Sequence, residues 1–373
     1  MRVLLSVVGT RGDVQPVIAL AVEVRTLGHD VRLCVPPNFI EWVEALGFPA
    51  TPVGIEMRAR RAGSTGVATP PPPIPDLIAD QFDVVERAAE GCDIILGANA
   101  HQYAAPSVAE LLGIRYVNAV YAPTALPNDE NSRAWNQRSL ERVNANRARR
   151  GLAPIDDVLR HIVTDQPWFA ADPTLAPTPS IAGMTITQTG AWILADSSPL
   201  PSALEAFLDA GDPPVYLGFG SMPVPDGTGR TLVEATRAAG HRAIISRGWA
   251  DLELIDNASD CIAIDDVNQQ ALFPRVAAVV HHGGAGTTHT AARAGAPQVL
   301  VPMFSDQPYW ASRVGELGIG TSVPITELTV DRLESALRVA GQPDIVERAT
   351  SFATQIATDG ALIAARRLAG YAS

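Results

Sequence analysis

The chain has 373 residues, a length that fits two α/β domains better than a single core. Apolar residues make up 47% of it and charged residues 18%, a balance that favours packed globular structure and argues against extended disorder. The formal net charge of −12 argues against nucleic-acid binding, because contacts with a phosphate backbone need clustered basic side chains.

The cysteines and the start of the chain carry no pattern for metal, disulfides or export. Cys34, Cys92 and Cys261 lack the spacing of a metal site or disulfide framework, and we interpret the first two as small core residues. The first residues lack the basic region and long apolar run of a secretory signal. No stretch approaches the roughly 20 apolar residues that cross a bilayer. We therefore expect a cytoplasmic protein without integral membrane contact.

A strand–helix–strand unit is predicted at the start of the chain. Residues 3–8 form an apolar run that ends at Gly9, which is typical of a strand buried on both faces. Apolar residues then recur at helical spacing between Pro16, in the first turn, and Gly28, at the end. A second apolar strand follows at residues 31–35. This unit predicts a parallel sheet.

The same alternation runs through two parts of the chain. In the first part we expect further helices and strands at residues 39–46, 50–53, 83–90, 93–96, 105–112 and 115–119. In the second part they fall at residues 215–219, 232–239, 243–245, 262–264, 277–281, 287–294, 298–301 and 309–317, before a helical tail. We place an N-terminal domain at residues 1–196, a linker at 197–214, a C-terminal domain at 215–355 and a final helix at 356–373.

Two segments of the N-terminal domain are interpreted as loops. Residues 57–75 contain four consecutive prolines and cannot form regular structure. A loop of this length is commonly functional, and it could be an acceptor lid or a surface for a partner. The second loop is expected at residues 126–136.

The strongest candidate site is the glycine-rich turn HHGGAGTT, which begins at His281. A strand runs directly into it and a helix follows, so the helix N-terminus can bind an anion while glycines allow close backbone approach. His282 could donate a hydrogen bond to a phosphate oxygen, and Thr287 and Thr288 could donate hydroxyls. A tight turn with satisfied core histidines is the plain alternative, but the combination favours a phosphate cradle.

The turn from Gly9 to Asp13 is a second candidate. It lacks the G-x-G-x-x-G spacing, and no acidic residue ends the next strand, which argues against a nicotinamide dehydrogenase. Asp13 lies at the start of a helix, where a carboxylate can cap the helix or act in catalysis, and both interpretations stay open. Ser221 is either a turn residue or a contact to a donor, and the sequence favours neither interpretation.

Asp306 and Gln307 follow a predicted strand. Side chains with several donors and acceptors at the carboxyl end of a strand suit a polyhydroxylated ligand. Asp306 could also be an N-cap followed by Pro308 in the first turn, and the two roles are compatible.

Several motifs together resemble those of the bacterial family-one glycosyltransferases, in particular those that decorate glycopeptide antibiotic aglycones such as vancomycin. The motifs are GTRGD at 9–13, GFGSMP at 218–223, VNQQALF at 267–273, HHGGAGTT at 281–288 and SDQPYWA at 305–311, with TDQPWFAADPTLAP at 164–177 and TQTGAWILAD at 187–196. The similarity extends over nearly the whole chain.

The resemblance implies an α/β fold of two Rossmann-like domains facing across a cleft, the GT-B architecture. The N-terminal domain would hold the acceptor and the C-terminal domain the nucleotide sugar, with the final helix crossing back to the first domain. It also implies inversion at the anomeric carbon without a metal. The sequence agrees, since it contains no D-x-D pair to hold a divalent ion.

Site residues follow from the same resemblance, position by position. Asp13 matches the general base, Asp306 and Gln307 match contacts to sugar hydroxyls, and Val267 would border the nucleobase with Trp249 as a second candidate. The diphosphate contacts match His282, Gly286 and Thr287. The remaining residues that we assign to donor binding are Thr10, Arg11, Gly12, Ser221 and Gly284.

The sequence therefore predicts a metal-independent glycosyltransferase that moves a sugar from a dTDP- or UDP-sugar to a hydroxyl of a natural product. A glycopeptide aglycone is the expected acceptor, with a polyketide or glycolipid as the alternative. No cofactor is expected beyond the nucleotide sugar, and the protein should be a monomer or a weak homodimer. The competing hypotheses are a catalytically silent auxiliary protein and a nucleotide-sugar 2-epimerase.

Overall fold

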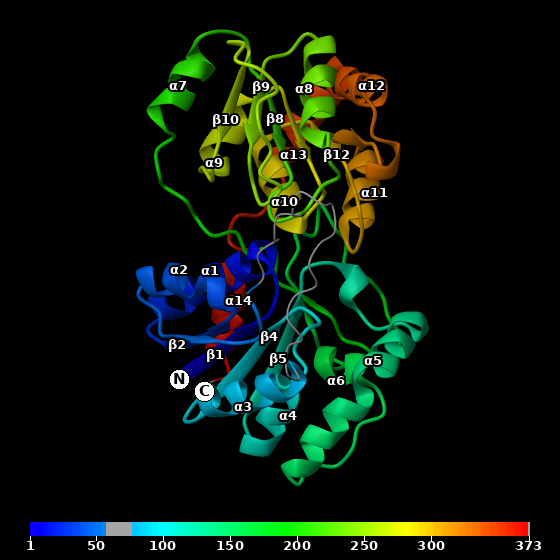
Figure 1. The fold of residues 1–373 in the computed structure, drawn as a ribbon. Helices are drawn as coiled ribbons and strands as arrows, with labels where there is room; N and C mark the ends of the chain where they lie inside the picture. The colour runs from blue at the N-terminus through cyan, green and yellow to red at the C-terminus, as the bar shows by residue number, and fades with distance from the viewer. Residues whose placement is uncertain (57–76, 372–373) are drawn as a thin grey trace. The chain divides into compact units, whose positions relative to one another are not determined.

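The computed structural model describes residues 1–56 and 77–371, which fold as two units (Figure 1). The first unit comprises Met1–Pro173, Pro177–Leu194 and Ala357–Ser373, and the second comprises Thr174–Ala176 and Ala195–Ile356. Each unit is built on one parallel sheet, which confirms the predicted fold class. The expected loop at residues 57–75, with its possible roles as a lid or partner surface, lies outside the described residues.

The first sheet has the strand order β3-β2-β1-β4-β5-β6-β7, and every neighbouring pair is parallel. The order therefore reverses between β1 and β4. In chain order the strands are β1 (Arg2–Val7), β2 (Asp30–Val35), β3 (Ala50–Pro52), β4 (Ile94–Ala98), β5 (Arg115–Val120), β6 (Trp168–Phe169) and β7 (Thr187–Gln188).

Helices cover the first sheet, and the last helix of the chain is one of them. They are α1 (Arg11–Thr26), α2 (Ile40–Ala45), α3 (Leu77–Ala89), α4 (Ala105–Leu112), α5 (Asp129–Arg149), α6 (Val158–Val163) and α14 (Gly360–Ala369). In Figure 1 the red α14 lies beside the blue α1. Its first residue, Gly360, fits against the chain at Gly190 and Ala191, where a Cβ would lie 2.5 Å from the carbonyl oxygen of Ala191.

The second sheet repeats the same arrangement. Its order is β10-β9-β8-β11-β12-β13, all parallel, with the reversal between β8 and β11. The strands are β8 (Val215–Gly218), β9 (Ala243–Ser246), β10 (Cys261–Ile264), β11 (Ala278–His281), β12 (Gln298–Leu300) and β13 (Gly320–Ser322). The helices are α7 (Ser202–Asp209), α8 (Thr228–Ala238), α9 (Gln269–Leu272), α10 (Ala285–Ala294), α11 (Gln307–Leu317), α12 (Val330–Ala340) and α13 (Pro343–Ala353).

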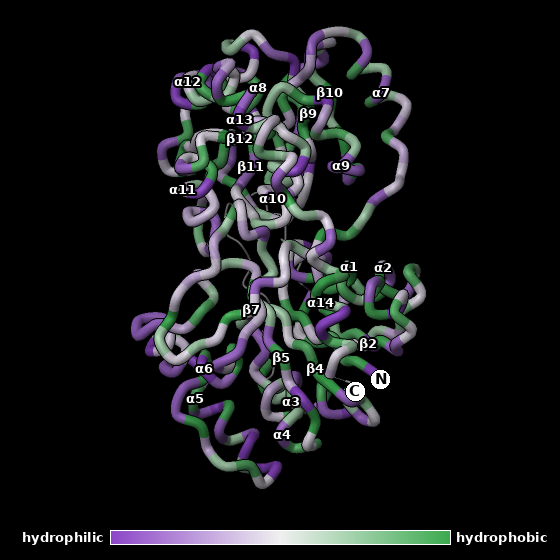
Figure 2. Tube along the Cα trace, turned by 180° about the vertical axis from the view of Figure 1, so that it is seen from behind, coloured by the Kyte–Doolittle hydropathy of each residue, from purple (hydrophilic) through white to green (hydrophobic). Residues whose placement is uncertain are grey.

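The predicted strands are present with small differences at their ends, but the expected loop at residues 126–136 is wrong over most of its length. The 21-residue helix α5 begins at Asp129 and continues to Arg149. It has no continuous apolar stripe, and much of it is purple in Figure 2. Its buried anchor is Arg147, which donates to Glu110 at 2.9 Å and to the hydroxyl of Ser107 at 2.8 Å.

The segment that we expected to be a linker, residues 197–214, contains regular structure. Helix α7 lies within it, and its Leu204 and Leu208 are buried in the core of the second unit. The short strand β7, at Thr187–Gln188, completes the first sheet just before this segment.

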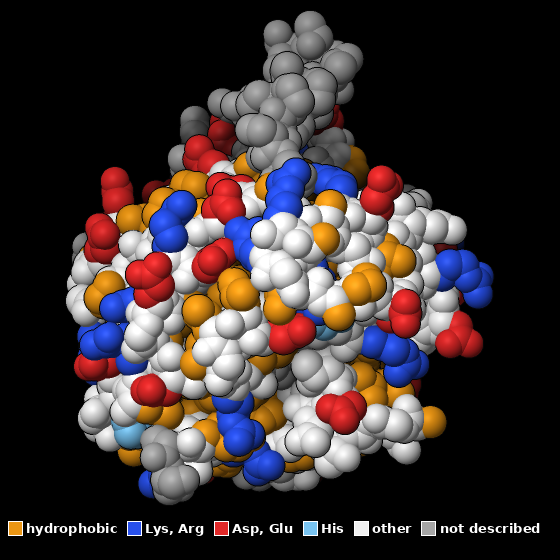
Figure 3. Space-filling model, turned by 90° about the horizontal axis from the view of Figure 1, so that it is seen from below, with side chains coloured by type: hydrophobic (Ala, Val, Ile, Leu, Met, Phe, Trp, Pro, Cys, Tyr) orange, Lys and Arg blue, Asp and Glu red, His pale blue; other side chains and the backbone are white. Residues whose placement is uncertain are grey.

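The cysteines, the lengths of the apolar helices and the surface charge of the described residues also bear on function. Cys34, Cys92 and Cys261 are all buried and unpaired. No helix within the described residues is both long and apolar enough to cross a membrane. On the face seen in Figure 3, basic and acidic side chains are interspersed, so a polyanion would meet both signs of charge there.

We expect the N-cap of α5 to matter because this helix has little apolar burial to stabilise it. The side-chain oxygen of Asn128 accepts hydrogen bonds from the backbone N–H groups of Glu130 and Asn131, at 3.0 and 2.9 Å. Asn128→Ala should lower the free energy of unfolding by about 1 kcal/mol, measured by urea denaturation. Asn128→Asp keeps the acceptor and is the matched control. Equal stability of Asn128→Ala and the wild type would contradict the assignment.

Candidate functional site

Most of the polar side chains predicted to bind a donor lie at the carboxyl ends of the strands in the second unit. In parallel sheets, ligands bind beyond these ends where the strand order reverses. Here the reversal is flanked by the loop after β8, which includes Gly220 and Ser221, and by the loop after β11, which begins at His282. The sequence-predicted cradle therefore lies at the position where a parallel sheet binds its ligand.

The two adjacent histidines of the cradle have different hydrogen-bond environments. His281 is fully buried, its Nδ1 accepts from the N–H of Gly283 at 3.1 Å, and its Nε2 lies 2.9 Å from Oε1 of Gln298. Because Nδ1 is an acceptor, Nε2 carries the proton and donates to Gln298. Burial lowers the pKa of His281 to about 3, so the ring is neutral. His281 is thus the satisfied core histidine of the plain alternative.

His282 differs from His281 in having an unsatisfied polar atom. Its Nδ1 is buried and has no hydrogen-bond partner among the described residues. Burial lowers the pKa of His282 to about 4, so this ring is also neutral near pH 7. An orphaned buried polar atom is unfavourable by about 1–3 kcal/mol, and a bound ligand that supplies a partner would remove that penalty.

Glycines allow the ring of His282 to lie close to the backbone. A Cβ on Gly284 would lie 2.5 Å from its Nε2, and a Cβ on Gly220 would lie 3.5 Å from its Cε1. The backbone of Gly284 has φ −65° and ψ 143°, which any residue can adopt. Glycine is needed at position 284 for space and not for its conformational freedom.

The N-terminus of α10 provides donors beside His282. Gly284 is the N-cap, and the first backbone bond of the helix runs from the N–H of Thr288 to the carbonyl of Gly284 at 3.0 Å. The N–H groups of Ala285, Gly286 and Thr287 therefore have no intrahelical acceptor. Together with the positive end of the helix dipole, they suit a phosphate group.

The structure corrects the predicted role of one hydroxyl of this turn. We expected Thr287 and Thr288 both to offer hydroxyls to a ligand. The hydroxyl of Thr288 instead donates to the carbonyl of Gly284 at 2.9 Å, and this residue is fully buried. Thr287 is half-buried and makes no such bond within the described residues, so it remains the candidate.

Asp306 and Gln307 are brought against the cradle by the loop after β12. Gln307 is buried, and its Oε1 accepts from the N–H of Met303 at 2.8 Å and of Phe304 at 3.3 Å. Asp306 occupies the N-cap position of α11, but its side chain makes no capping hydrogen bond to the helix backbone. Its Oδ2 instead accepts from the indole of Trp310 at 2.8 Å. A Cβ on Gly283 would lie 3.2 Å from the carbonyl oxygen of Gln307, so the two loops pack closely.

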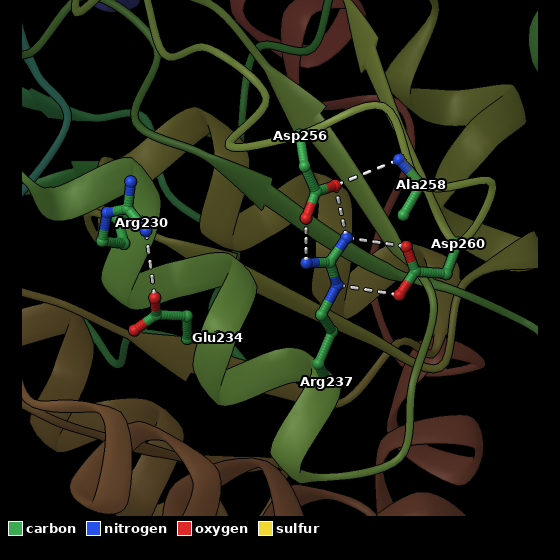
Figure 4. A network of polar contacts seen from close by, with 6 residues as sticks. All are labelled: Arg230, Glu234, Arg237, Asp256, Ala258 and Asp260. Atoms are coloured by element: carbon green, nitrogen blue, oxygen red, sulfur yellow. Dashed lines mark hydrogen bonds and ion pairs between the residues drawn. The ribbon is translucent and has the colours of Figure 1, made fainter.

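Trp249 belongs to the connection between β9 and β10, and this connection contains no helix. The N–H of Trp249 donates to the carbonyl of Gly220 at 2.8 Å, which ties the connection to the loop after β8. Its far end is fixed by Arg237 of α8, whose guanidinium binds both Asp256 and Asp260 with two hydrogen bonds each, as Figure 4 shows. Hydrogen bonds from Arg237 lower the pKa of Asp256 to about 2, so the pair stays ionised.

Val267 and Ser221 complete the predicted donor contacts of the second unit. Val267 is half-buried after β10 and packs against the apolar cluster on one face of the sheet. Ser221 is half-buried and directly follows Gly220, whose φ of +55° turns the chain after β8. Ser221 follows β8 beside the reversal, whereas Val267 follows β10 at the edge of the sheet. Their predicted contacts with a donor stay predictions.

Asp13 lies at the corresponding position of the first unit, in the first turn of α1 directly after β1. Its Oδ2 accepts from the N–H of Thr10 at 2.8 Å and from the hydroxyl of Thr10 at 3.3 Å. Its Oδ1 accepts from the amide of Asn99 at 2.5 Å, and the hydroxyl of Tyr121 donates to its backbone carbonyl at 2.9 Å. Asp13 therefore caps the helix and also faces the end of β4.

Burial is the main influence on the charge of Asp13. Desolvation raises the pKa of Asp13 above its ordinary value, while the hydrogen bonds from Thr10 and Asn99 and the nearby His101 oppose the rise. A Cβ on Gly9 would overlap the carboxylate, so glycine at this position makes room for it. A carboxylate with a raised pKa is a better proton acceptor than a free aspartate side chain.

The other residues of the first turn lie with Asp13 in the first unit and not with the cradle. Thr10 is the N-cap of α1, and Gly12 is exposed. The guanidinium of Arg11 lies 5.2 Å from the ring centre of Trp42 in α2, a cation–π contact. Their predicted role in donor binding stays a prediction.

A group of three aromatic rings, one of which is His101 near Asp13, was not predicted from the sequence. The rings of His101, Tyr103 and Trp135 contact one another, with centroid distances of 5.3–6.3 Å. Burial lowers the pKa of His101 and the charge of Asp13 opposes this, which reflects their proximity. The group joins the end of β4 to the start of α5, so the missed helix also hid this cluster.

Comparisons with known proteins agree over the whole chain. The model for the glycosyltransferase family 28 N-terminal domain matches residues 3–126, and that for the erythromycin biosynthesis protein CIII-like C-terminal domain matches residues 231–361. The vancomycin aglycone glucosyltransferase of Amycolatopsis orientalis is 47% identical over 99% of this chain and 97% of its own length. Glycosyltransferase GtfE of the same organism is 45% identical over 98% and 96%.

Solved structures show the same fold. Spinosyn forosaminyltransferase SpnP has a TM-score of 0.76 at 20% identity and covers both chains fully. Glycosyltransferase VinC, solved in complex with dTDP, has a TM-score of 0.69 at 24% identity over 95% of each chain.

The two parallel sheets and these structural matches show the GT-B fold, and the relatives at 45–47% identity show that the chain is a glycosyltransferase. The chain belongs to the glycosyltransferase family that includes the vancomycin aglycone glucosyltransferase. The resemblance predicted from the sequence motifs is therefore confirmed.

We expect Gly284→Ala to displace the ring of His282 without disturbing the fold, because the backbone suits alanine and only the Cβ contact is too close. The Kd for dTDP and UDP, measured by calorimetry, should rise at least about tenfold, or about 1.4 kcal/mol. Gly315→Ala, at an exposed helical glycine with no atom near the added Cβ, is the matched control. Unchanged affinity of Gly284→Ala would remove His282 from the binding site.

Proposed function

We propose that this glycosyltransferase moves a sugar from dTDP or UDP to a hydroxyl of a glycopeptide aglycone, with inversion and without a metal. The observation that carries the proposal is the carboxylate of Asp13, fixed at the strand reversal of the first sheet by Thr10 and Asn99. The first unit would serve the acceptor and the second unit the nucleotide sugar.

The acceptor half of the reaction is assigned to Asp13. As the acceptor oxygen forms a bond to the anomeric carbon, Asp13 takes the proton from that hydroxyl, and the bond from the anomeric carbon to the diphosphate breaks. A single displacement of this kind inverts the anomeric centre. The raised pKa of Asp13 supports this role, because the acceptor proton then moves to a stronger base.

The donor half is assigned to the cradle. The N–H groups at the start of α10, the hydroxyl of Thr287 and the neutral ring of His282 would hold the diphosphate and the charge that develops on it. Asp306 and Gln307 would contact the sugar hydroxyls, and Val267 and Trp249 would border the base. The proposal needs no divalent cation, because the helix N-terminus supplies the opposing electrostatic potential.

A glycopeptide acceptor is supported by the relatives and by the aromatic group near Asp13. The curated relatives include the vancomycin aglycone glucosyltransferase and the dTDP-epi-vancosaminyltransferase of Amycolatopsis orientalis, the latter 44% identical over 94% of this chain. The half-exposed rings of Tyr103 and Trp135 could stack on aromatic side chains of such an aglycone. The silent auxiliary protein and the 2-epimerase have no support among these relatives.

Asp13→Asn should lower kcat by about two orders of magnitude or more while leaving the Kd for dTDP nearly unchanged. In the wild type, kcat/KM should fall as the pH drops through the pKa of Asp13, because only the ionised carboxylate accepts a proton. Since burial raises that pKa, the acidic limb should lie above the ordinary range for aspartate. Wild-type turnover of Asp13→Asn would remove Asp13 from the role of base.

The acceptor surface is tested by Trp135→Ala, which removes the central ring of the aromatic group. KM for the vancomycin aglycone should rise about tenfold, with little change in the Kd for dTDP, and Trp135→Phe should retain most of the affinity. Equal KM values for the wild type and the alanine variant would place the acceptor elsewhere. The anomeric configuration of the product, determined by NMR, tests inversion directly.

A further inference from the structure

Asn99 has an unusual backbone conformation directly beside Asp13. It follows β4 and has φ +60°, in the left-handed region that non-glycine residues rarely adopt. Asparagine tolerates this region better than most residues, yet the conformation is still less favourable than a strand or a right-handed turn. Conformations of this kind persist where the surrounding structure fixes them, and they are concentrated at functional sites.

The surrounding structure does fix Asn99 on both sides of its backbone. Its N–H donates to the carbonyl of Ala119 in β5 at 2.8 Å. Its carbonyl accepts from the side-chain amide of Asn118 at 3.2 Å, and the same amide donates to the carbonyl of Gly97 at 3.1 Å. Asn118 is fully buried, so it holds the turn after β4 from within the core.

The result of this anchoring is the direction of the Asn99 side chain. Its Nδ2 donates to Oδ1 of Asp13 at 2.5 Å, while Thr10 holds Oδ2 of the same carboxylate. One oxygen is thus held from α1's own N-terminus and the other from the neighbouring strand. The plane of the carboxylate is fixed by two independent parts of the fold.

We propose that Asn99 is a positioning residue that orients the carboxylate of Asp13 toward the acceptor hydroxyl. This inference rests on the proposed role of Asp13 as the base. Asn99 has no assigned contact with either substrate and acts only through Asp13.

A comparison with glycine and aspartate explains why an amide side chain suits position 99. Glycine would keep the left-handed turn but leave Oδ1 of Asp13 without its donor. Aspartate would keep the turn and the shape of the side chain, but it would place a second carboxylate against the first. An amide both donates a hydrogen bond and carries no charge, so it orients Asp13 while favouring its ionised form.

Other titratable groups also face Asp13 and must be separated from the effect of Asn99. His101 interacts electrostatically with Asp13, and so does the buried hydroxyl of Tyr121. The pKa of Tyr121 lies well above 10, so it does not titrate in the acidic range. His101→Gln removes the only one of these two neighbours that titrates there.

The test compares Asn99→Gly and Asn99→Asp with the wild type, with Thr164→Gly as the matched control. Thr164 has φ +64° and follows α6, so this control also places glycine at a left-handed position in the first unit. For each variant, kcat, the KM for the vancomycin aglycone, the Kd for dTDP and the pH profile of kcat/KM are measured. The profile is repeated in the His101→Gln background, so that a shift in its acidic limb can be assigned to Asp13.

Asn99→Gly should lower kcat by about 10- to 100-fold with an unchanged Kd for dTDP. Its acidic limb should move to higher pH, because a donor that favours ionised Asp13 is lost. Asn99→Asp should move the limb further, because two adjacent carboxylates cannot readily both ionise. Thr164→Gly should behave as the wild type.

The inference would be overturned if Asn99→Gly had the same kcat as the wild type and the same acidic limb in its pH profile. A lower kcat with an unmoved limb and a lower Tm would also overturn it, since it would indicate a structural role only. If Asp13→Asn itself retains turnover, the proposed base is wrong. If Asp13→Asn is inactive but Asn99→Gly is not impaired, only the positioning role fails.

Discussion

The reversal of strand order in each parallel sheet is the constraint on which both sites depend. At the reversal, the connections from two adjacent strands leave in opposite directions, so no connection covers the strand ends between them. In the first sheet the strands concerned are β1 and β4, and in the second they are β8 and β11. Four candidate residues, Asp13 with Asn99 and Ser221 with His282, follow these strands.

Close packing at these strand ends depends on missing side chains. The carboxylate of Asp13 occupies the space that a Cβ on Gly9 would need, and the imidazole of His282 occupies the space beside Gly284. In both cases a polar side chain folds back against its own turn, which brings it within reach of the helix N-terminus. Gly9 and Gly284 look like ordinary turn residues in the sequence. In the structure they make room for the side chains of Asp13 and His282.

The sequence predicted what depends on apolar periodicity and local spacing. The strands of both sheets alternate with amphipathic helices, and the cradle from His281 to Thr288 is a contiguous motif. The polar helix α5 was missed because Arg147 and a few small residues, and not an apolar stripe, are its buried contacts. Asn99 was missed because its role requires a contact with Asp13, 86 residues away, and a positive φ. Neither feature has a local sequence pattern.

For adjacent residues in the cradle, the sequence does not predict which of the two faces a ligand. Which of His281 and His282, or of Thr287 and Thr288, faces a ligand is decided by where β11 ends and α10 begins. With Gly284 as the N-cap, the side chain of Thr288 reaches back to the carbonyl of Gly284 and is used within the helix. A shift of the helix start by one residue would exchange the roles of the two threonines, and residue types alone do not fix that boundary.

Burial shifts the pKa values of His282 and Asp13 in opposite directions, and in both groups it favours the neutral form. For His282 it favours the neutral ring, so under the proposed function the cradle would hold a diphosphate with dipoles and hydrogen bonds. For Asp13 it favours the neutral acid and so strengthens the base, while Thr10 and Asn99 act in the opposite direction. Without those two donors the carboxylate would bind a proton more readily and would be ionised over a narrower range of pH. The hydrogen bonds that fix the direction of Asp13 thus also favour its ionised form, which the proposed role as a base requires.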